Sequence, residues 1–342
     1  MRPFEILIAL LLKIDGEHTI EIIQTYLNNL LKRYSARGFL MGLSGGIDSA
    51  VLATLAAGAT ASAAVHAAYI FDRDNENLSG TNARRVAEKL GIELQETNFD
   101  PMLNQIGIYA STPMQITRSS RTINRLLHWV CRLVLSERPF ITSLRMGSGE
   151  LNVKDFRSRF FKIACQNVEK GFNLRHVQRR TILERQASEK NLLLLGAANR
   201  TEWLTGWFVK GGIDDLPIQP LKGLYKTQVR QLASCLEIPE DIIKQSPSPD
   251  MMRGITDEYA FGIHYQQLDM ALDYLEGGIT DQDIKKMGIT MKTIKRVQEM
   301  KRLSSWKRTS AGEPTPVDGG PTSALRLWQA GRCVNPTIIA PI

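Results

Sequence analysis

The sequence has few cysteines, four among 342 residues, and none of them belongs to a Cys-x-x-Cys pair. They are Cys131, Cys165, Cys235 and Cys333. This wide spacing argues against a zinc site made of neighbouring thiols and against a disulfide framework. It is typical of a protein of the reducing cytoplasm, which is the location that we expect.

The sequence also lacks an apolar run that could cross a membrane. The apolar stretch at residues 4–14 is interrupted or bounded by Glu5, Lys13 and Asp15, and it is too short to span a bilayer. It has neither the basic start nor the small-residue cleavage site of a secretory signal. We therefore expect an amphipathic first helix that continues through residues 19–34, and no membrane partner.

A glycine-rich turn at residues 44–49 lacks the Gly-Lys-Ser/Thr of a Walker A loop. It reads Ser-Gly-Gly-Ile-Asp-Ser between a strand-like apolar run and a helix-like segment. Glycines let the backbone approach a ligand closely, and the first N–H groups of a helix have no intrahelical partners, so this turn can cradle a phosphate. Asp48 would repel a bare phosphate unless Mg²⁺ lay between them. The alternative is an ordinary strand–helix turn with a Ser or Asp cap.

Strand-like apolar runs alternate with helical patterns along much of the chain. We expect strands at 38–43, 63–71, 92–99 and 191–197, helices after residue 47, at 80–91 and at 177–190, and mostly helices up to about residue 303. This order predicts an α/β fold: a Rossmann-like parallel sheet with helices on both faces and a helical C-terminal part.

The carboxyl ends of parallel strands carry ligands, so the loops after Leu43 and Leu195 become candidate site loops. In the second loop, Glu202 lies in the first turn of a predicted helix. It is either a partner of the helix dipole or, beside Asp48, a second carboxylate for Mg²⁺. Lys210 is either a surface lysine or a cation for phosphate.

The net charge of +8 is concentrated in one segment. Residues 114–162 hold ten Lys and Arg against three Asp and Glu, and residues 122–135 within them have helical spacing of apolar side chains. A solvated basic face on a packed helix, a site for anionic phosphates, and a nucleic-acid or membrane surface all fit this composition.

The motifs together resemble a known family. The glycine-rich turn resembles the PP-loop of the ATP pyrophosphatases, whose fold is that of the adenine nucleotide alpha hydrolases. The stretches "GAANRTE", "DLPIQPLKGLYKTQVRQLA", "IPEDIIKQSPSPD" and "GITDEYAFGIHYQQLD" are similar to those of ammonia-dependent NAD synthetases, over residues 18–100 and 171–310. The resemblance implies a ligase that amidates deamido-NAD with ammonia through an acyl-adenylate and releases AMP and pyrophosphate, with ATP and Mg²⁺ as cofactors.

The resemblance also implies roles for residues on the ATP side. The loop residues Ser44, Gly45, Gly46, Asp48 and Ser49 would hold the pyrophosphate. Asp48 and Glu202 would hold Mg²⁺, while Lys210 and Ser248 match positions that contact phosphate and ATP.

On the acceptor side, Asn173 and Arg179 match the family signature that contacts the dinucleotide. Lys307 stands where the family has a His-Lys pair, and the resemblance makes it a candidate catalytic residue together with Asp48 and Lys210.

Three departures from the family pattern fall on this acceptor side. Val177 replaces the first arginine of the signature, Trp306 replaces the histidine of the terminal pair, and only "GGIDDL" separates Lys210 from Pro217. Either aspartate of this short loop could replace the acid of the longer family loop. A diverged AMP-forming amide ligase that acts on another anionic carboxylate is therefore an alternative. A PP-loop tRNA-modifying enzyme fits less well, because it normally has a catalytic cysteine or cysteine-based zinc elements, so we do not expect nucleic acid as a partner.

We expect residues 1–310 to form a single NAD-synthetase-like PP-loop domain, in which residues 101–170 are an enlarged basic insertion, and residues 311–342 to form an extended C-terminal tail. The position of the loop at residue 44 leaves no room for an amino-terminal glutaminase domain, so free ammonia or a separate partner would supply the nitrogen. The family implies a homodimer.

Overall fold

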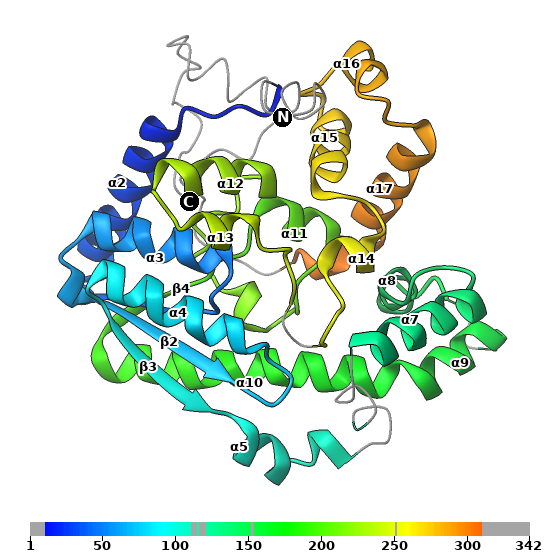
Figure 1. Cartoon of the computed structure of the whole chain (residues 1–342), viewed down its shortest axis with the longest axis horizontal. Helices are drawn as coiled ribbons and strands as arrows, with labels where there is room; N and C mark the ends of the chain where they lie inside the picture. Colours follow the sequence, from blue (N-terminus) through cyan, green and yellow to red (C-terminus); the bar gives the residue numbers. More distant parts are fainter. Residues whose placement is uncertain (1–10, 111–114, 116–120, 152–153, 250–251, 310–342) are drawn as a thin grey trace, which may run out of the picture.

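The computed structural model describes residues 11–110, 115, 121–151, 154–249 and 252–309. Four parallel strands form its sheet, in the order β3–β2–β1–β4 (Figure 1). Their bounds are β1 Gly38–Gly42, β2 Val65–Phe71, β3 Glu93–Asn98 and β4 Leu192–Leu195. All three pairings are parallel, so the predicted parallel sheet is confirmed.

The loops after β1 and β4 emerge side by side, because Met41 of β1 pairs with Leu195 of β4. The chain leaves β1 towards β2 and β3 on one side, and β4 lies on the other. This pair is therefore the topological switch point of the sheet, where ligands of such folds bind.

Both faces of the sheet are buried, which explains why its central strands are almost entirely apolar. Phe39 and Met41 point into one core and Leu40, between them, into the other. The first core is completed by α2 (Gly16–Tyr34), α3 (Ile47–Ala59), α4 (Asn77–Leu90) and α12 (Lys226–Cys235). The second is completed by α5 (Asp100–Gln105), η2 (Ile108–Ala110) and the long α10 (Gln166–Lys190).

A third core belongs to the helical C-terminal part, which the sequence also predicts. Leu268, Leu272 and Val297 are fully buried there and pack with Leu144 of α8 (Pro139–Gly147). The helices of this part are α11 (Arg200–Thr205), α13 (Glu240–Lys244), α14 (Asp257–Phe261), α15 (Tyr265–Leu275), α16 (Asp281–Lys286) and α17 (Met291–Leu303). Short 3-10 turns are η1 (Ser62–Ala64), η3 (Ile213–Asp215) and η4 (Ser305–Lys307).

The three helices that the structure describes over residues 121–151 and 154–164 lie together at the right of Figure 1, on the opposite side of the molecule from α2. They are α7 (Arg121–Leu135), α8 (Pro139–Gly147) and α9 (Phe156–Ala164), and α7 confirms the predicted helix at 122–135. The side chains of α7 that face solvent include large apolar ones: Ile123, Leu126, Leu127, Trp129, Val130 and Leu133. The outer face of α7 is therefore apolar as well as basic.

Several arginines of this basic segment bind neighbouring elements. Arg121 pairs with Glu76, Arg125 donates to the carbonyl of Gly254 at 3.0 Å, and Arg145 pairs with Glu137 at 3.0 Å. Part of the positive surplus therefore stabilises contacts within the chain.

The first helix differs from the sequence prediction. Residues 13–15 are not helical, and α2 begins at Gly16, because the Asp15 carboxylate caps it by accepting from the His18 N–H at 3.1 Å. The continuous helix that we expected is therefore wrong at this point. Helix α10 begins at Gln166, earlier than the predicted residue 177. The predicted tail at 311–342 lies outside the described residues.

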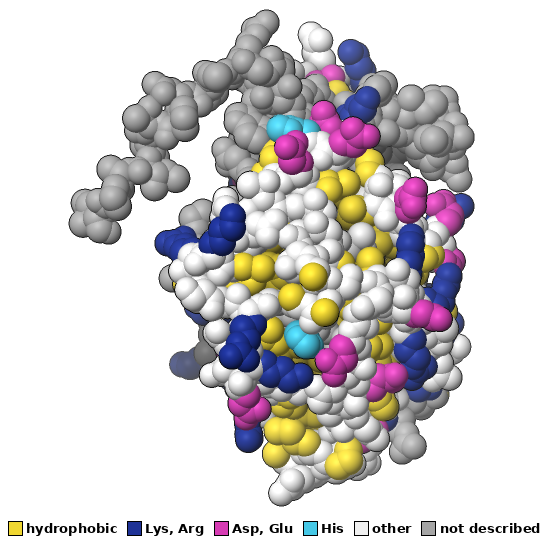
Figure 2. All heavy atoms as spheres, turned by 90° about the vertical axis from the view of Figure 1, so that its left-hand side faces the viewer, with side chains coloured by type: hydrophobic (Ala, Val, Ile, Leu, Met, Phe, Trp, Pro, Cys, Tyr) yellow, Lys and Arg dark blue, Asp and Glu magenta, His cyan; other side chains and the backbone are white. Residues whose placement is uncertain are grey.

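The face over α2 and α3, on the left of Figure 1, carries charged side chains of both signs scattered among apolar and neutral ones (Figure 2). The positive surplus is thus not gathered on this face. Within the described part of the chain, no helix is both long enough and apolar enough to cross a bilayer.

Candidate functional site

The turn between β1 and α3 needs glycine at one position, whereas at the next a Cβ would make only ordinary contact. Gly45 has φ of +79°, and a Cβ there would come within 2.0 Å of the Ser79 carbonyl oxygen. Gly46 has an ordinary φ of −88°, and the nearest atom to a Cβ built on it is Ser44 Oγ at 3.4 Å. Gly45 is therefore fixed by conformation and close packing, whereas Gly46 keeps the start of α3 clear of a side chain.

Ser44 and Ser49 hold the shape of this turn. Ser49 Oγ donates to the Gly46 carbonyl at 2.9 Å and accepts from the Ser44 N–H at 3.2 Å, and the two hydroxyl oxygens are 3.1 Å apart. Gly46 is the N-cap of α3, and no side chain caps this helix. The first N–H groups of α3 thus form a preorganised anion site at the carboxyl end of β1.

The turn after β4 places a second acid beside Asp48. Asn199 caps α11: its side-chain oxygen accepts from the Glu202 N–H at 3.0 Å, and Glu202 Oε2 accepts from the Asn199 N–H at 3.2 Å. The Asn199 side-chain amide donates to Asp48 Oδ1 at 2.9 Å. One buried asparagine therefore joins the two loops that the sequence singled out.

Lys226 is the functional side chain that the sequence interpretation missed. It is the first residue of α12, its side chain is 3% exposed, and its ammonium binds Asp48 Oδ2 and lies 3.6 Å from Glu202 Oε1. A cation in the first turn of a helix is unfavourable for the helix dipole, so a lysine at this position of the sequence indicates a role other than helix stabilisation. The structure brings Asp48, Glu202 and Lys226 together at the switch point.

The electrostatics of the three groups depend on one another. Burial raises the pKa of Glu202 well above its usual value, and the nearby Asp48 carboxylate raises it further. Burial alone would lower the pKa of Lys226, but Asp48 and Glu202 outweigh it and the pKa is raised. The lysine therefore stays protonated, while Glu202 resists ionisation even beside this ammonium.

A second layer of buried groups supports this cluster. The Tyr265 hydroxyl donates to Asp257 Oδ2 at 2.7 Å, and Asp257 is a further buried acid that raises the pKa of Lys226. Thr201 of α11 links to Asp269, with Oγ1–Oδ1 at 2.5 Å, and accepts from the Lys226 N–H at 2.9 Å. These contacts fix the backbone at the start of α12 against α11 and α15, and with it the point from which the Lys226 side chain extends.

The donor set fits a hard divalent cation. Proteins usually hold Mg²⁺ through one or two carboxylates and leave its other positions to phosphate oxygens and water. Asp48 and Glu202 already share one cation, the Lys226 ammonium, next to the open start of α3. Among the described residues no group of three or more His, Cys, Asp or Glu side chains is placed to hold a metal alone. Oxygens of a bound phosphate would therefore have to complete the coordination.

Two other predicted cations lie on a different part of the site, around residues 206–215. Lys210 donates to the Trp306 carbonyl at 3.0 Å and to Thr309 Oγ1 at 2.6 Å. Lys307 donates to the carbonyls of Gly206, at 2.7 Å, and Phe208. Burial lowers the pKa of Lys307 to about 8. The structure thus joins these lysines to the loop after α11 and to η4, and neither contact involves Asp48 or Glu202.

The two aspartates of the short loop differ in their partners. Asp215 is buried and accepts from the Gly211 N–H at 2.9 Å, so it stabilises the loop itself. Asp214 pairs with His176 of α10 at 2.7 Å. Burial would raise the pKa of Asp214, but His176 outweighs it and the pKa is lowered. Asp214 is therefore the aspartate that faces α10, where the candidate acceptor residues lie.

Asn173 and Arg179 are on the same helix but not at the same place. Asn173 is exposed, whereas Arg179 donates to Asp72 Oδ2 at 2.8 Å. Asp72 also binds the fully buried Arg175 at 3.2 Å. The structure does not bring Asn173 and Arg179 together, and it ties Arg179 to the residue that follows β2.

Ser248 lies on an exposed segment after α13. Its hydroxyl donates to the Ile255 carbonyl at 3.2 Å. Three residues earlier, Gln245 accepts from the side-chain amide of Asn82 at 2.9 Å, and the same amide reaches the Gly45 carbonyl at 3.4 Å. The segment that carries Ser248 is thus anchored near the phosphate loop through Asn82.

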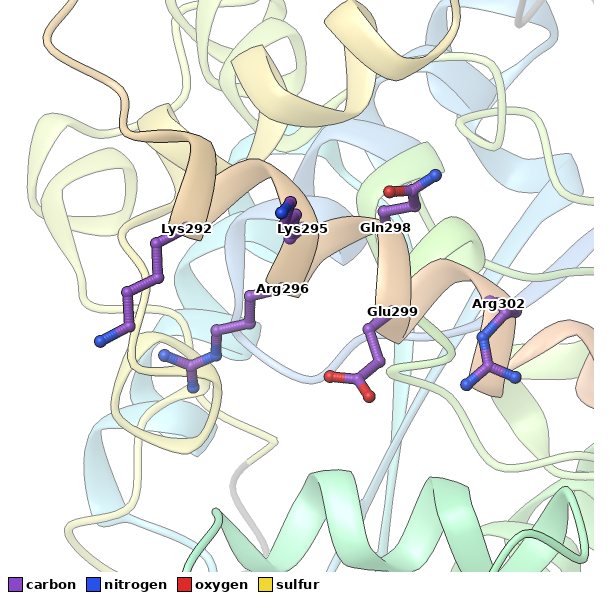
Figure 3. A pocket seen from close by; sticks show the side chains of 6 residues that line it. All are labelled: Lys292, Lys295, Arg296, Gln298, Glu299 and Arg302. Carbon is purple, nitrogen blue, oxygen red and sulfur yellow. The ribbon is translucent and has the colours of Figure 1, made fainter.

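A hollow on the described surface lies away from this site. It has a volume of about 490 Å³ and runs along α17, where Figure 3 shows its lining side chains. They are Lys292, Lys295, Arg296, Gln298, Glu299 and Arg302. Arg296 donates to the Phe261 carbonyl, and Glu299 and Arg302 pair with Arg145 and Glu150. This hollow is a solvated face with several of its charges already paired, and it shares no residue with the site.

The sequence matches the NAD synthase family over residues 19–120 and 136–311. The NH3-dependent NAD+ synthetase of Thermotoga maritima is 32% identical over 286 residues, covering 82% of this chain and 96% of that protein.

Among solved structures, the NMN synthetase of Francisella tularensis superposes with a TM-score of 0.61 at 23% identity, over 88% of this chain and 99% of that one. The NH3-dependent NAD synthetase of Campylobacter jejuni superposes with a TM-score of 0.60 at 19% identity, over 88% of this chain and 100% of that one. Both likenesses show the fold, and the expected Rossmann-like architecture is confirmed. The family match and the curated relative lead to one assignment: this chain belongs to the NAD synthase family.

Proposed function

We propose that the protein is an ammonia-dependent NAD synthetase, which joins deamido-NAD and ammonia at the expense of ATP and forms AMP and pyrophosphate. The observation that carries this proposal is the convergence of Asp48, Glu202 and Lys226 beside the uncapped start of α3. Membership of the NAD synthase family supports it. The free thiols and the absence of a membrane-spanning helix among the described residues agree with a place in the cytoplasm, which belongs to the same proposal.

Attack of a carboxylate on the α-phosphorus of ATP needs charge neutralisation and a leaving pyrophosphate held in line. The N–H groups at the start of α3 and the hydroxyl of Ser44 are suited to bind that pyrophosphate, while Ser49 holds the shape of the turn. The ammonium of Lys226 can add positive charge from the side of β4. When bound, Mg²⁺ held by Asp48 and Glu202 would supply further charge to the phosphate oxygens.

The second half of the reaction, in which ammonia attacks the acyl-adenylate, needs fewer protein groups. Ammonia is a good nucleophile and needs no covalent cysteine, and none of the three described thiols belongs to the cluster around Asp48. The residues that remain for the acceptor lie around α10 and the loop 206–215. We assign the positioning of the anionic acceptor to Lys307 and Lys210 from the loop side and to Arg179 from α10.

A panel of acceptors tests the proposal. Pyrophosphate and AMP are measured with ATP, Mg²⁺ and ammonium in the presence of deamido-NAD, nicotinate mononucleotide, or neither. Release that depends on deamido-NAD, with NAD as a product, is expected. Formation of ADP and orthophosphate in place of AMP and pyrophosphate would contradict the proposal.

A second candidate is a diverged AMP-forming ligase that amidates a different anionic carboxylate. Two observations on the acceptor side favour it: Val177 stands in place of an arginine, and Arg179 is already paired with Asp72. Pyrophosphate release with nicotinate mononucleotide or another acid, and none with deamido-NAD, would select this candidate. It leaves the ATP side unchanged.

We also propose that the chain forms a homodimer through the apolar face of α7 and α9. Leu126 and Leu133 are each 57% exposed on α7, and Phe156 of α9 is 67% exposed. An apolar surface of this extent is typical of an interface rather than of solvent. Light scattering should give twice the mass of the chain, and Leu126→Asp with Leu133→Asp should give the mass of one chain. A monomeric parent protein would contradict this part of the proposal.

A further inference from the structure

Two cysteines that are far apart in the sequence lie against each other in the fold. Cys131 is in the middle of α7, and Cys165 links α9 to α10. Their sulfur atoms are 3.8 Å apart, and both side chains are only partly exposed. Helix α7 and helix α9, which ends immediately before Cys165, pack side by side at the right of Figure 1. The two sulfurs are therefore in van der Waals contact, the proximity that formation of a disulfide requires.

The two thiols have different roles in this contact. The Cys165 thiol is directed as a donor at the sulfur of Cys131. This hydrogen bond lowers the pKa of the Cys131 thiol, whereas it raises the pKa of the Cys165 thiol. Cys131 is thus the better thiolate, and Cys165 is the thiol held beside it.

We propose that Cys131 and Cys165 form a redox-active dithiol, which a low-molecular-weight disulfide such as oxidised glutathione converts reversibly into an intramolecular disulfide. This modification site is independent of the proposed ligase activity. It also differs from the four separate thiols that the sequence suggests, because the fold, and not the spacing, pairs them.

The exchange proceeds in two balanced steps. The Cys131 thiol loses its proton, and its sulfur attacks one sulfur of the small disulfide, which breaks that bond and releases one small thiolate. The Cys165 thiol then loses its proton, and its sulfur attacks the Cys131 sulfur, which releases the second small thiolate. The protein loses two hydrogen atoms, and the small disulfide is reduced to two thiols once the released thiolates are protonated.

The bond would tie together elements that lead to opposite sides of the site. On α7, the Asn124 side chain donates to the Arg253 carbonyl at 3.0 Å, in the segment that follows Ser248. On α10, Arg175 and Arg179 bind Asp72 after β2. A disulfide between Cys131 and Cys165 would also close a loop of the chain that contains α8 and α9. Such a closed loop restricts the unfolded chain.

The test is made on the full chain, first reduced and then incubated with oxidised glutathione. The expected product has lost two hydrogen atoms, and its digest contains a peptide that joins Cys131 to Cys165. The thermal midpoint of the oxidised protein should be higher than that of the reduced protein, and dithiothreitol should reverse both changes.

Matched serine variants separate this pair from the other thiols. Cys165→Ser should keep a glutathione adduct on Cys131, because the resolving thiol is absent. Cys235→Ser and Cys333→Ser should form the same internal bond as the parent chain. Full alkylation of both thiols after glutathione treatment of the folded parent, or a cross-link that joins either of them to Cys235 or Cys333, would overturn the proposal.

Discussion

The sheet region and the α7–α9 region of this chain are stabilised in different ways. In the sheet region, apolar residues such as Phe39 and Met41 are buried. The acids after the strand ends have hydrogen-bond partners, as Asp48 has in the Asn199 amide. In the α7–α9 region, large apolar side chains such as Leu126 lie outside. One region is complete in a single chain. The other leaves large apolar side chains exposed, and we propose that a second chain covers them.

The largest expected effect is in the sheet region, at the pair of acids. Glu202→Gln should lower AMP-forming pyrophosphate release by roughly a thousandfold, because it removes charge from the cluster that holds the leaving group. Steady-state pyrophosphate release measures it, with circular dichroism to verify the fold. The control is Glu184→Gln on the exposed side of α10, which should keep the parent rate. Equal rates for the two variants would mean that the acids are structural.

Lys226→Met should affect both activity and stability. Without the ammonium, Asp48 and Glu202 face each other without a cation, so we expect the free energy of unfolding to fall by about 3 kcal/mol in the absence of ligand. The rate should fall by about a hundredfold because a phosphate contact is lost. Urea unfolding and turnover measure the two effects. Lys244→Met, which alters an exposed lysine, is the control and should change neither.

Lys307 gives the acceptor side a measurable pH dependence. Its pKa is lowered to about 8 by burial, whereas a lysine of the unfolded chain keeps its proton up to about pH 10.4. Between these values the unfolded state binds more protons, so this lysine makes the free energy of unfolding rise with pH, by about 3 kcal/mol at most. Lys307→Met should lack this rise. Urea unfolding at several pH values compares the parent protein with the variant. If the free energy of unfolding depended on pH in the same way in both, the lowered pKa of Lys307 would be refuted.

The smallest expected effect on stability is that of truncating an exposed apolar side chain of α7. The same truncation in the core of the sheet region gives the comparison. At dilutions where the chain is monomeric, Leu133→Ala should change the free energy of unfolding by less than about 0.5 kcal/mol, because its side chain is exposed. The same substitution at Leu55, which is fully buried in α3, should cost about 3 kcal/mol. Chemical unfolding monitored by tryptophan fluorescence compares them. A large loss from Leu133→Ala would show that α7 packs within its own chain.

The parts of the fold that the sequence predicts are those encoded locally. The run before Ser44 is buried on both faces and therefore apolar throughout, and its end is marked by glycines, so β1 and α3 could be located within about a residue or two. The sequence does not predict the break before α2, because two apolar runs stand only a few residues apart on either side of it. The cap that Asp15 makes is the local signal that marks the break.

The candidate site was predictable to the extent that its residues follow strands. Asp48 and Glu202 were expected to meet because parallel strands end at one edge, and they do. Lys226 begins a helix after a loop with no strand, so only its position against the helix dipole marked it. The pairing of Arg179 with Asp72 joins residues more than a hundred positions apart, and no pattern within either segment indicates it.

The single side chain of Asn199 has a consequence for how the two acids are positioned. Its oxygen receives the backbone hydrogen of Glu202, and its nitrogen gives a hydrogen to Asp48, so one planar group sets the distance between two loops. A different orientation of the Asn199 side-chain amide would displace both Asp48 and Glu202. An aspartate in its place could still begin the helix, but it would present an oxygen to an oxygen. Replacing Asn199 by aspartate would therefore separate the two halves of the site.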